Sequence, residues 1–143
     1  MAGLRGVGGT LVLDADGLSK LAAKDRGAYK RFEAARKHRS QVVTTASTLT
    51  EVLRGGSRDA AVHHWLKLIT VVTIDKEFGR AAGELLGRTG LSGHRCALDA
   101  LLAAVALAQP RPVVLLTSDP HDLKTLTEEP HRPKAERIAV VTI

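Results

Sequence analysis

The feature that most constrains this chain is an apolar run that leads directly into a carboxylate. Leu11, Val12 and Leu13 are followed by Asp14. A continuous apolar run predicts a buried strand that is covered on both faces, as in a parallel sheet. Ligands of open α/β sheets bind at the carboxyl ends of the strands, so Asp14 stands where chemistry is expected. It could equally well cap the helix that follows.

Four more apolar or β-branched runs predict strands, and helical patterns lie between them. The predicted strands after the first cover residues 41–45, 69–74, 113–116 and 137–142. Strands that alternate with helices predict a parallel sheet with right-handed crossovers. We therefore expect an α/β fold with a central, mostly parallel sheet of about five strands. At 143 residues, the chain is expected to be a single domain over 1–143.

The net charge suggests a polyanion as partner. The formal charge is +6, from 21 basic and 15 acidic residues. If four acids share one site, the remaining 11 face 21 bases, which describes a basic body around an acidic pit. Residues 17–40 alone carry eight bases and two acids. This segment is either a solvated face or a surface for phosphate or an acidic partner.

Cysteine content and hydropathy indicate a soluble, cytoplasmic protein. Cys96 is the single cysteine, so an intrachain disulfide and a cysteine-based zinc site are excluded. The N-terminal nine residues contain no apolar segment of a signal peptide. The most apolar predicted helix, residues 96–108, is too short to span a bilayer and carries Asp99. No membrane association is expected.

Four acids are candidates for a common site, although each has a structural alternative. Asp14 could be a helix cap, and Glu51 could close a capping box in the first turn of a helix that opens at residue 47 or 48. Asp99 could complement a helix dipole near the start of its helix. Asp119 could cap a helix whose first residue is a proline.

Taken together, the four acids point to a divalent cation. Asp14 and Asp119 follow buried strands, and Glu51 lies on the helix after the second strand. Asp99 is the only charge within a helix that is expected to be buried, and Arg95 is the one nearby base. A buried carboxylate without a partner is costly. A shared Mg²⁺ or Mn²⁺ ion, which prefers carboxylate oxygens, would account for all four.

The same acids lie in four motifs through which the chain resembles the PIN-domain nucleases, in particular the VapC-type toxins of bacterial toxin–antitoxin pairs. The motifs are Leu11-Val12-Leu13-Asp14-Ala15, the segment 47–55 (STLTEVLRG), the segment 98–104 (LDALLAA) and the segment 116–123 (LTSDPHDL). The resemblance covers nearly the whole chain. It implies a PIN-like three-layer α/β/α fold, a cognate antitoxin, a homodimer, and Mg²⁺- or Mn²⁺-dependent cleavage of RNA that leaves 5′-phosphate and 3′-hydroxyl ends.

The resemblance also assigns the metal site. It implies Asp14, Glu51, Asp99 and Asp119 as catalytic and metal-binding residues, with Asp122 as a possible addition. We expect Asp14, Asp99 and Asp119 to be direct ligands, and Glu51 to hold a water or a second ion. Two hydroxyls in the last motif could orient these acids by hydrogen bonds; they belong to Thr117 and Ser118.

Two departures from the family pattern concern the site itself. Asp16 stands where many relatives carry a small residue, which places a fifth carboxylate near the site. His121 stands where relatives often have another acid. His94 and His121 could line the cleft, although a lone histidine is more often a surface residue.

Two other functions fit part of the pattern. The segment 11–17 also matches the opening motif of haloacid-dehalogenase-like phosphatases, with Asp14 as nucleophile and Asp16 as acid. That family requires a lysine before its last acids, and none lies between Lys76 and Lys124. The other alternative is a PIN-like module that binds RNA or a partner without cutting. The retained carboxylates argue against it.

Overall fold

Five parallel strands form one sheet in the computed structural model, which describes residues 8–143. The strand order is β3-β2-β1-β4-β5, and every pairing is parallel. The predicted number and direction of the strands are confirmed. The N-terminal nine residues, for which we expect no signal peptide, lie mostly outside the described residues. The strands are β1 (Thr10–Leu13), β2 (Gln41–Thr45), β3 (Thr70–Val72), β4 (Val113–Thr117) and β5 (Ala139–Thr142).

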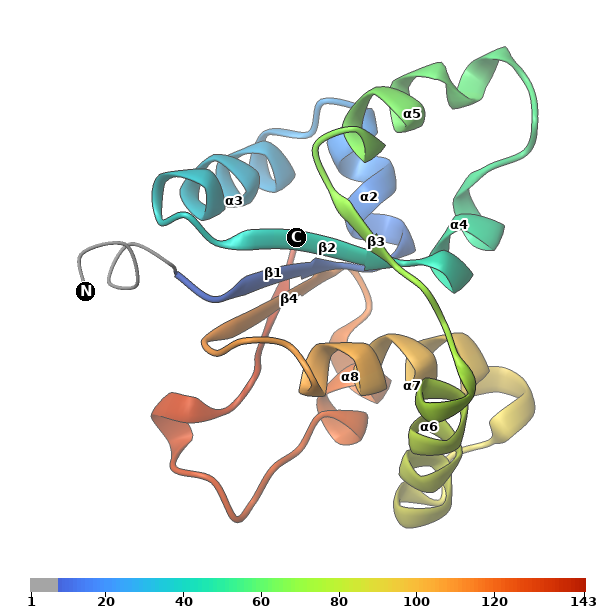
Figure 1. Cartoon of the computed structure of the whole chain (residues 1–143), viewed down its shortest axis with the longest axis vertical. Helices are drawn as coiled ribbons and strands as arrows, with labels where there is room; N and C mark the ends of the chain where they lie inside the picture. The colour runs from blue at the N-terminus through green and yellow to red at the C-terminus, as the bar shows by residue number, and fades with distance from the viewer. Residues whose placement is uncertain (1–7) are drawn as a thin grey trace.

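Helices connect successive strands. They are α2 (Ala15–Ala22), α3 (Arg26–Lys37), α4 (Ala46–Val52), α5 (Ala60–Leu66), α6 (Lys76–Thr89), α7 (Gly93–Leu107) and α8 (Pro120–Leu126), with short 3₁₀ turns η1 (Ser57–Asp59) and η2 (Lys134–Glu136). Figure 1 shows α2, α3 and α5 on one face of the sheet and α6, α7 and α8 on the other. The expected three-layer α/β/α arrangement is therefore confirmed.

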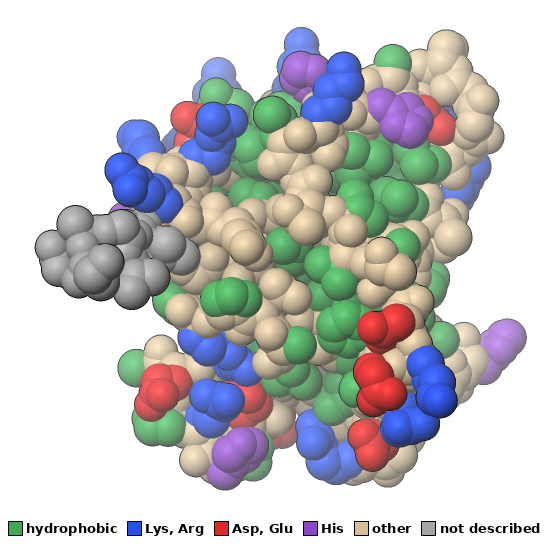
Figure 2. Space-filling view, in the orientation of Figure 1, with side chains coloured by type: hydrophobic (Ala, Val, Ile, Leu, Met, Phe, Trp, Pro, Cys, Tyr) green, Lys and Arg blue, Asp and Glu red, His purple; other side chains and the backbone are tan. Residues whose placement is uncertain are grey.

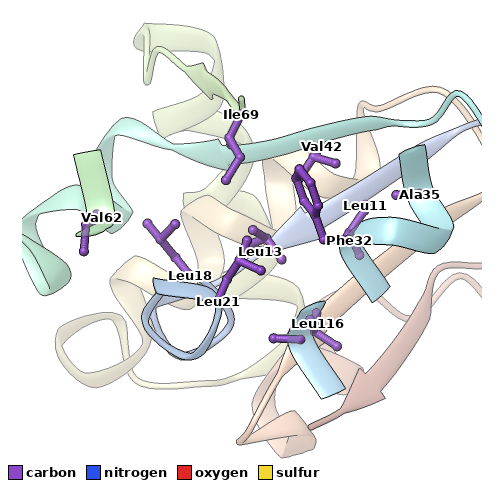
Figure 3. Packing of buried hydrophobic residues seen from close by; sticks show 11 residues of the cluster. Leu11, Leu13, Leu18, Leu21, Phe32, Ala35, Val42, Val62, Ile69 and Leu116 are labelled. Carbon is purple, nitrogen blue, oxygen red and sulfur yellow. The ribbon is translucent and has the colours of Figure 1, made fainter. Parts of the chain in front are cut away.

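Alternate side chains along the strands pack into the hydrophobic layers on opposite faces of the sheet. Leu11 and Leu13 of β1 pack with α2, α3 and α5, as Figure 3 shows, whereas Val12 packs toward α7 and α8. This period of two is the geometry of a strand buried on both faces. Trp65, predicted to be a core residue or a subunit contact, is partly buried against the first layer, with its ring centroid 5.0 Å from that of Phe32.

Two helices begin earlier than the sequence pattern predicts. The helix after β2 starts at Ala46, with Thr45 as its N-cap, rather than at residue 47 or 48, and it ends at Val52, before the glycine pair at 55–56. The helix predicted over 96–108 starts at Gly93, with Ser92 as its N-cap. Both shifts change where the candidate acids lie on their helices. The prediction that the helix over 96–108 is buried on all sides is wrong, because Leu98 is 38% exposed.

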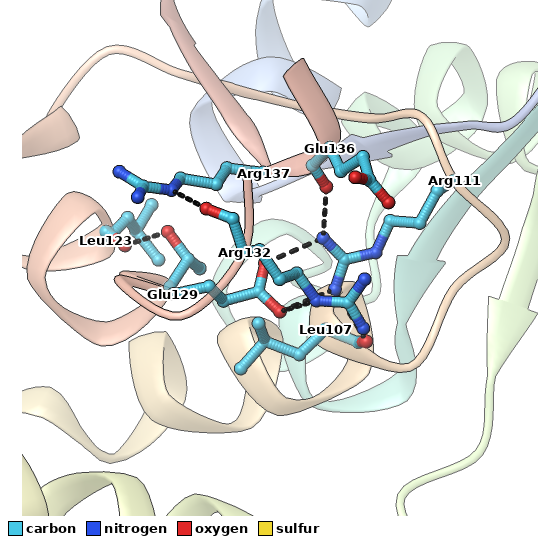
Figure 4. Close-up of polar contacts among 8 residues, drawn as sticks. Leu107, Arg111, Leu123, Glu129, Arg132, Glu136 and Arg137 are labelled. Atoms are coloured by element: carbon cyan, nitrogen blue, oxygen red, sulfur yellow. Dashed lines mark hydrogen bonds and ion pairs between the residues drawn. The ribbon is translucent and has the colours of Figure 1, made fainter. Parts of the chain in front are cut away.

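A buried ion-pair network holds the C-terminal loop against the end of α7. Glu129 is 7% exposed, and its carboxylate accepts hydrogen bonds from both terminal nitrogens of Arg111, at 2.7 and 3.0 Å. The Nε of Arg132 lies 2.9 Å from the same carboxylate. Figure 4 shows this cluster, with Arg111 also donating to the carbonyl oxygen of Leu107. The network fixes the path of the chain between α8 and β5.

The bases of segment 17–40 are exposed, except Lys20 of α2, which is partly exposed. Figure 2 shows lysine and arginine side chains gathered over α3. None of the ion pairs found within residues 8–143 involves a base of this segment. Over the same described range, no helix combines the length and the apolar character needed to cross a membrane.

Candidate active site

The carboxyl ends of β1, β2 and β4 open onto a polar pocket of about 240 Å³. It is lined by all four predicted acids and by a fifth; these are Asp14, Asp16, Glu51, Asp99 and Asp119. Ligands of such folds bind at this edge, where the connections after neighbouring strands lead to opposite sides of the sheet. A larger hollow of about 450 Å³ lies at the amino ends, beside Thr10 and Pro112, and its lining within the described chain contains no acid.

Asp14 both caps a helix and faces the pocket. Its Oδ1 accepts the backbone N–H of Gly17 at 2.7 Å, so the capping interpretation holds. Burial raises the pKa of Asp14, and a side-chain hydrogen bond with Thr117 opposes that rise. A Cβ at position 17 would lie 3.0 Å from the carbonyl oxygen of Leu116, so glycine lets α2 approach β4 closely. This close packing fixes the carboxylate at the strand end.

Glu51 reaches the pocket from the last turn of α4, not from the first. The Oγ1 of Thr45 accepts the backbone N–H of Thr48 at 3.0 Å, so Thr45 is the cap and the predicted capping box of Thr48 with Glu51 is wrong. Thr48 instead lines the pocket one helical turn before Glu51. That spacing of three residues could have predicted their shared face. The pKa of Glu51 is raised by partial desolvation, although the residue is largely exposed, and by the charges of Asp99 and Asp14.

Asp99 lies too far along α7 to complement the helix dipole. The helix begins six residues earlier, and its first turn contains no acid, so the dipole interpretation is wrong. The side chain is half-buried. Burial, followed by the charges of Asp14, Asp122 and Asp119, raises its pKa to about 6. Within residues 8–143, no ion pair offsets these charges. Asp99 is therefore the acid whose charged form is most disfavoured by burial and by neighbouring charges.

Asp119 and Asp16 are held by the loop that follows β4. Asp119 precedes α8 without a capping hydrogen bond from its side chain, which leaves the carboxylate at the pocket. Its backbone N–H donates to the Oγ1 of Thr117 at 3.0 Å. The hydroxyl of Ser118 donates to the carboxylate of Asp16 on α2. Thr117 thus contacts two of the four predicted acids, whereas Ser118 contacts Asp16, a fifth acid that also lines the pocket.

Asp122 and the two histidines lie outside the pocket lining. Asp122 accepts a hydrogen bond from the thiol of Cys96 at 3.6 Å, and its charge contributes to the raised pKa of Asp99. His94 and His121 are exposed, and within the described chain neither lines the pocket.

The donor set suits a hard divalent cation. Every candidate ligand is a carboxylate oxygen, and burial together with neighbouring negative charge raises the pKa of Asp14, Glu51 and Asp99, which disfavours their charged forms in the absence of a cation. In the described part of the chain, no three acidic, histidine or cysteine side chains already surround one ion position. Mg²⁺ is usually bound by only one or two carboxylates and keeps several waters, so such an arrangement is not required. The residues fit the ion.

Comparison with known proteins identifies the family. The PIN domain model matches residues 11–126, and the chain belongs to the PIN-domain family. No curated protein matches the chain.

Solved structures from three VapBC complexes share the fold over more than nine tenths of this chain. VapBC2 from Rickettsia felis, bound to a promoter DNA fragment, is 16% identical, with a TM-score of 0.65 over 92% of this chain and 98% of that chain. DNA-bound VapBC from Salmonella typhimurium is 19% identical, with a TM-score of 0.62 over 92% and 97%. VapBC-1 from nontypeable Haemophilus influenzae is 12% identical, with a TM-score of 0.56 over 93% and 97%.

Proposed function

We propose that this PIN-domain protein is a Mg²⁺- or Mn²⁺-dependent endoribonuclease and the toxin of a toxin–antitoxin pair. The observation that carries the proposal is the convergence of five carboxylates on one pocket at the ends of β1, β2 and β4. The similarity of the fold to the VapBC structures supports the toxin assignment. We propose further that a single domain carries the activity and that it acts in the cytoplasm.

Each acid has a proposed role in phosphodiester hydrolysis. The direct ligands of the cation come from Asp14, Asp99 and Asp119: one or two of these carboxylates bind the ion, and the others hold its water molecules. A bound divalent cation lowers the pKa of water and stabilises charge on the phosphate. Glu51, which is exposed on α4, orients the attacking water or holds a second ion. Asp122, which is not among the lining residues, adds to the negative field that retains the cation.

Hydrogen bonds from the β4–α8 loop keep the acids in place. Thr117 contacts both Asp14 and the backbone of Asp119, and Ser118 holds Asp16. Such contacts orient ligands before the cation binds. Cleavage is proposed to leave 5′-phosphate and 3′-hydroxyl ends.

The proposed protein partners are an antitoxin and a second copy of this chain. The three solved structures described above, which share this fold, are structures of VapBC. The formal charge of +6 suits an acidic antagonist as well as RNA. Expression of this protein alone should arrest growth, and co-expression with the adjacent small gene should relieve the arrest. Harmless expression at a high level, with nothing copurifying, would contradict the toxin role.

RNA cleavage by purified protein tests the nuclease. Cleavage should require Mg²⁺ or Mn²⁺ and stop in EDTA. Cleavage that continues unchanged in EDTA would exclude the metal mechanism, and metal-dependent RNA binding without cleavage would favour the non-catalytic module. The phosphatase alternative has lost its basis, because the chain belongs to the PIN family and no lysine is among the described lining residues. Absence of phosphate release from p-nitrophenyl phosphate would confirm this.

A further inference from the structure

The carboxylate pocket also contains a positively charged side chain to which the proposed cleavage mechanism gives no role. Arg95 lines the pocket together with Leu98 and Asp99, which lie three and four residues later, about one turn further along the same face of α7. Among the lining residues that the structure describes, Arg95 is the only lysine or arginine. It therefore faces the same space as five acids.

Arg95 is not neutralised by those acids. The side chain is exposed, and within residues 8–143 the ion pairs join other residues. Its backbone N–H donates to the Oγ of Ser92 at 3.4 Å in the N-cap of α7. The backbone is thus anchored at a defined point of the pocket rim while the guanidinium keeps its donors for a ligand.

The stability of α7 does not explain a base at this position. Arg95 lies in the first turn, where the positive end of the helix dipole disfavours cations and favours anions. Since Arg95 has no compensating ion pair in the described structure, its placement costs helix stability. A helix end and an adjacent guanidinium both attract a negatively charged group.

The charge of the pocket identifies that group. A nucleic-acid strand is a polyanion, and five carboxylates repel it even when a divalent cation offsets part of their charge. A guanidinium presents a planar set of donors that matches the oxygens of a phosphate. We infer that Arg95 binds a backbone phosphate of the nucleic-acid strand held at the pocket. The inference rests on the proposed function for the class of substrate, and it makes Arg95 a substrate-binding residue of that site.

Salt-dependent binding of single-stranded RNA tests this role without requiring cleavage. Binding is measured in an Asp99→Asn background, with a labelled oligoribonucleotide at several salt concentrations. Each phosphate contact to a single strand contributes about 0.7 to the slope of log K against log salt. Arg95→Gln should therefore make the slope shallower by about 0.7, and Arg95→Lys should keep it. The matched control is Arg88→Gln, which removes an exposed charge on α6 outside the pocket and should leave the slope unchanged.

Steady-state cleavage by the otherwise wild-type protein gives a second readout. Arg95→Gln should raise KM for RNA roughly tenfold or more, because a hydrogen bond to a charged group is lost. Arg95→Lys should recover part of that loss, and melting temperatures should show that both variants fold.

The two proposals fail in different ways. If RNA is cut and Arg95→Gln keeps the wild-type slope and KM, the inference is wrong and the nuclease function stands. If the wild-type protein never cuts RNA but binding still depends on Arg95, the inference stands and the nuclease function is wrong. Equal slope changes in Arg95→Gln and Arg88→Gln would also overturn the inference, because they would report net charge alone.

Discussion

Leu13 of β1 lies opposite Leu116 of β4 in the parallel register of the sheet. The strands run in the same direction, so the segments that follow them leave the sheet at one edge. The backbone N–H of Asp14 donates to the carbonyl oxygen of Leu116 at 3.4 Å, which continues the pairing to the point where β1 ends. The approach of Asp14 to Asp119 thus follows from strand pairing rather than from local sequence.

Replacement of Asp99 by Asn tests whether Asp99 is a metal ligand or an acid with only a structural role. Asn keeps the shape of the side chain and removes a charge that its neighbours disfavour. Asp99→Asn should abolish cleavage and leave the metal-free protein as stable as the wild type or more so, by on the order of 1 kcal/mol. Mn²⁺ at 100 times its Kd should stabilise the wild type by about 2.7 kcal/mol, and the variant should lose most of this. Thermal melts with and without Mn²⁺ measure both effects.

The control for that experiment is Glu84→Gln, an exposed acid of α6 outside the pocket. It should keep activity and the full Mn²⁺ stabilisation. An Asp99→Asn protein that still cuts RNA and gains as much stability from Mn²⁺ as the wild type would contradict the metal-ligand role.

The stability of the metal-free protein should depend on pH with an unusual sign. The pKa of Asp99 rises from 3.8 to about 6, and those of Asp14 and Glu51 also rise. Between those values the folded state binds more protons than the unfolded state. The free energy of unfolding should therefore fall as pH rises from about 4 to about 6, and then stay low. Because Asp99 is half-exposed, its share should be only about 1 kcal/mol.

Urea denaturation in EDTA at a series of pH values measures this dependence. Asp99→Asn should flatten it. Stability that rises steadily from pH 4 to pH 6 in the wild type would show that the pKa values of these acids are not raised in the folded protein. The lowered pKa values of Asp59 and Glu129 act in the opposite direction, and their stabilisation is lost as pH falls further.

Loss of the N-cap of α4 should lower both the stability and the activity of the protein. Thr45 is fully buried, and its Oγ1 accepts the N–H of Thr48, one of the free N–H groups in the first turn of the helix that carries Glu51. Thr45→Ala should cost about 1–2 kcal/mol in unfolding free energy and lower the cleavage rate, because the start of α4 sets the position of Glu51. Thr45→Ser retains the oxygen and should keep activity. Equal activity of the Ala and Ser variants would show that the cap does not position the site.

Loss of the Glu129 carboxylate should destabilise the protein without affecting the chemistry. Glu129→Gln leaves the partly buried guanidinium of Arg111 without its counter-charge, so unfolding free energy should fall by roughly 3 kcal/mol. The neighbouring exposed Glu128→Gln should change stability by less than about 0.5 kcal/mol. Denaturant titration compares the two. Cleavage well below the melting temperature should be the same in both, since neither residue lines the pocket.

Helix starts were harder to predict than strands. Residues 44–48 contain four hydroxyl side chains, Thr44, Thr45, Ser47 and Thr48, and each is an acceptable cap by itself. Thr44 does not serve as the cap, because the Oγ1 of Thr44 donates to the carbonyl oxygen of Leu13 at 2.8 Å across the sheet. Thr45 is the cap instead. The contact between Thr44 and Leu13 joins residues 31 positions apart and has no local signal in the sequence.

The sequence by itself determined the parallel sheet and the acids at its edge. Apolar runs that end in Asp14 and near Asp119 specify strands buried on both faces, and the carboxyl ends of parallel strands meet on one side. Only the tertiary structure decided how those acids interact. The hydrogen bond of Ser118 to Asp16 spans 102 residues, and the raised pKa of Asp99 comes from burial and from charges on two other segments, 14–16 and 119–122. Electrostatic interaction depends on distance in space and on burial, and neither is encoded in the local pattern of residues.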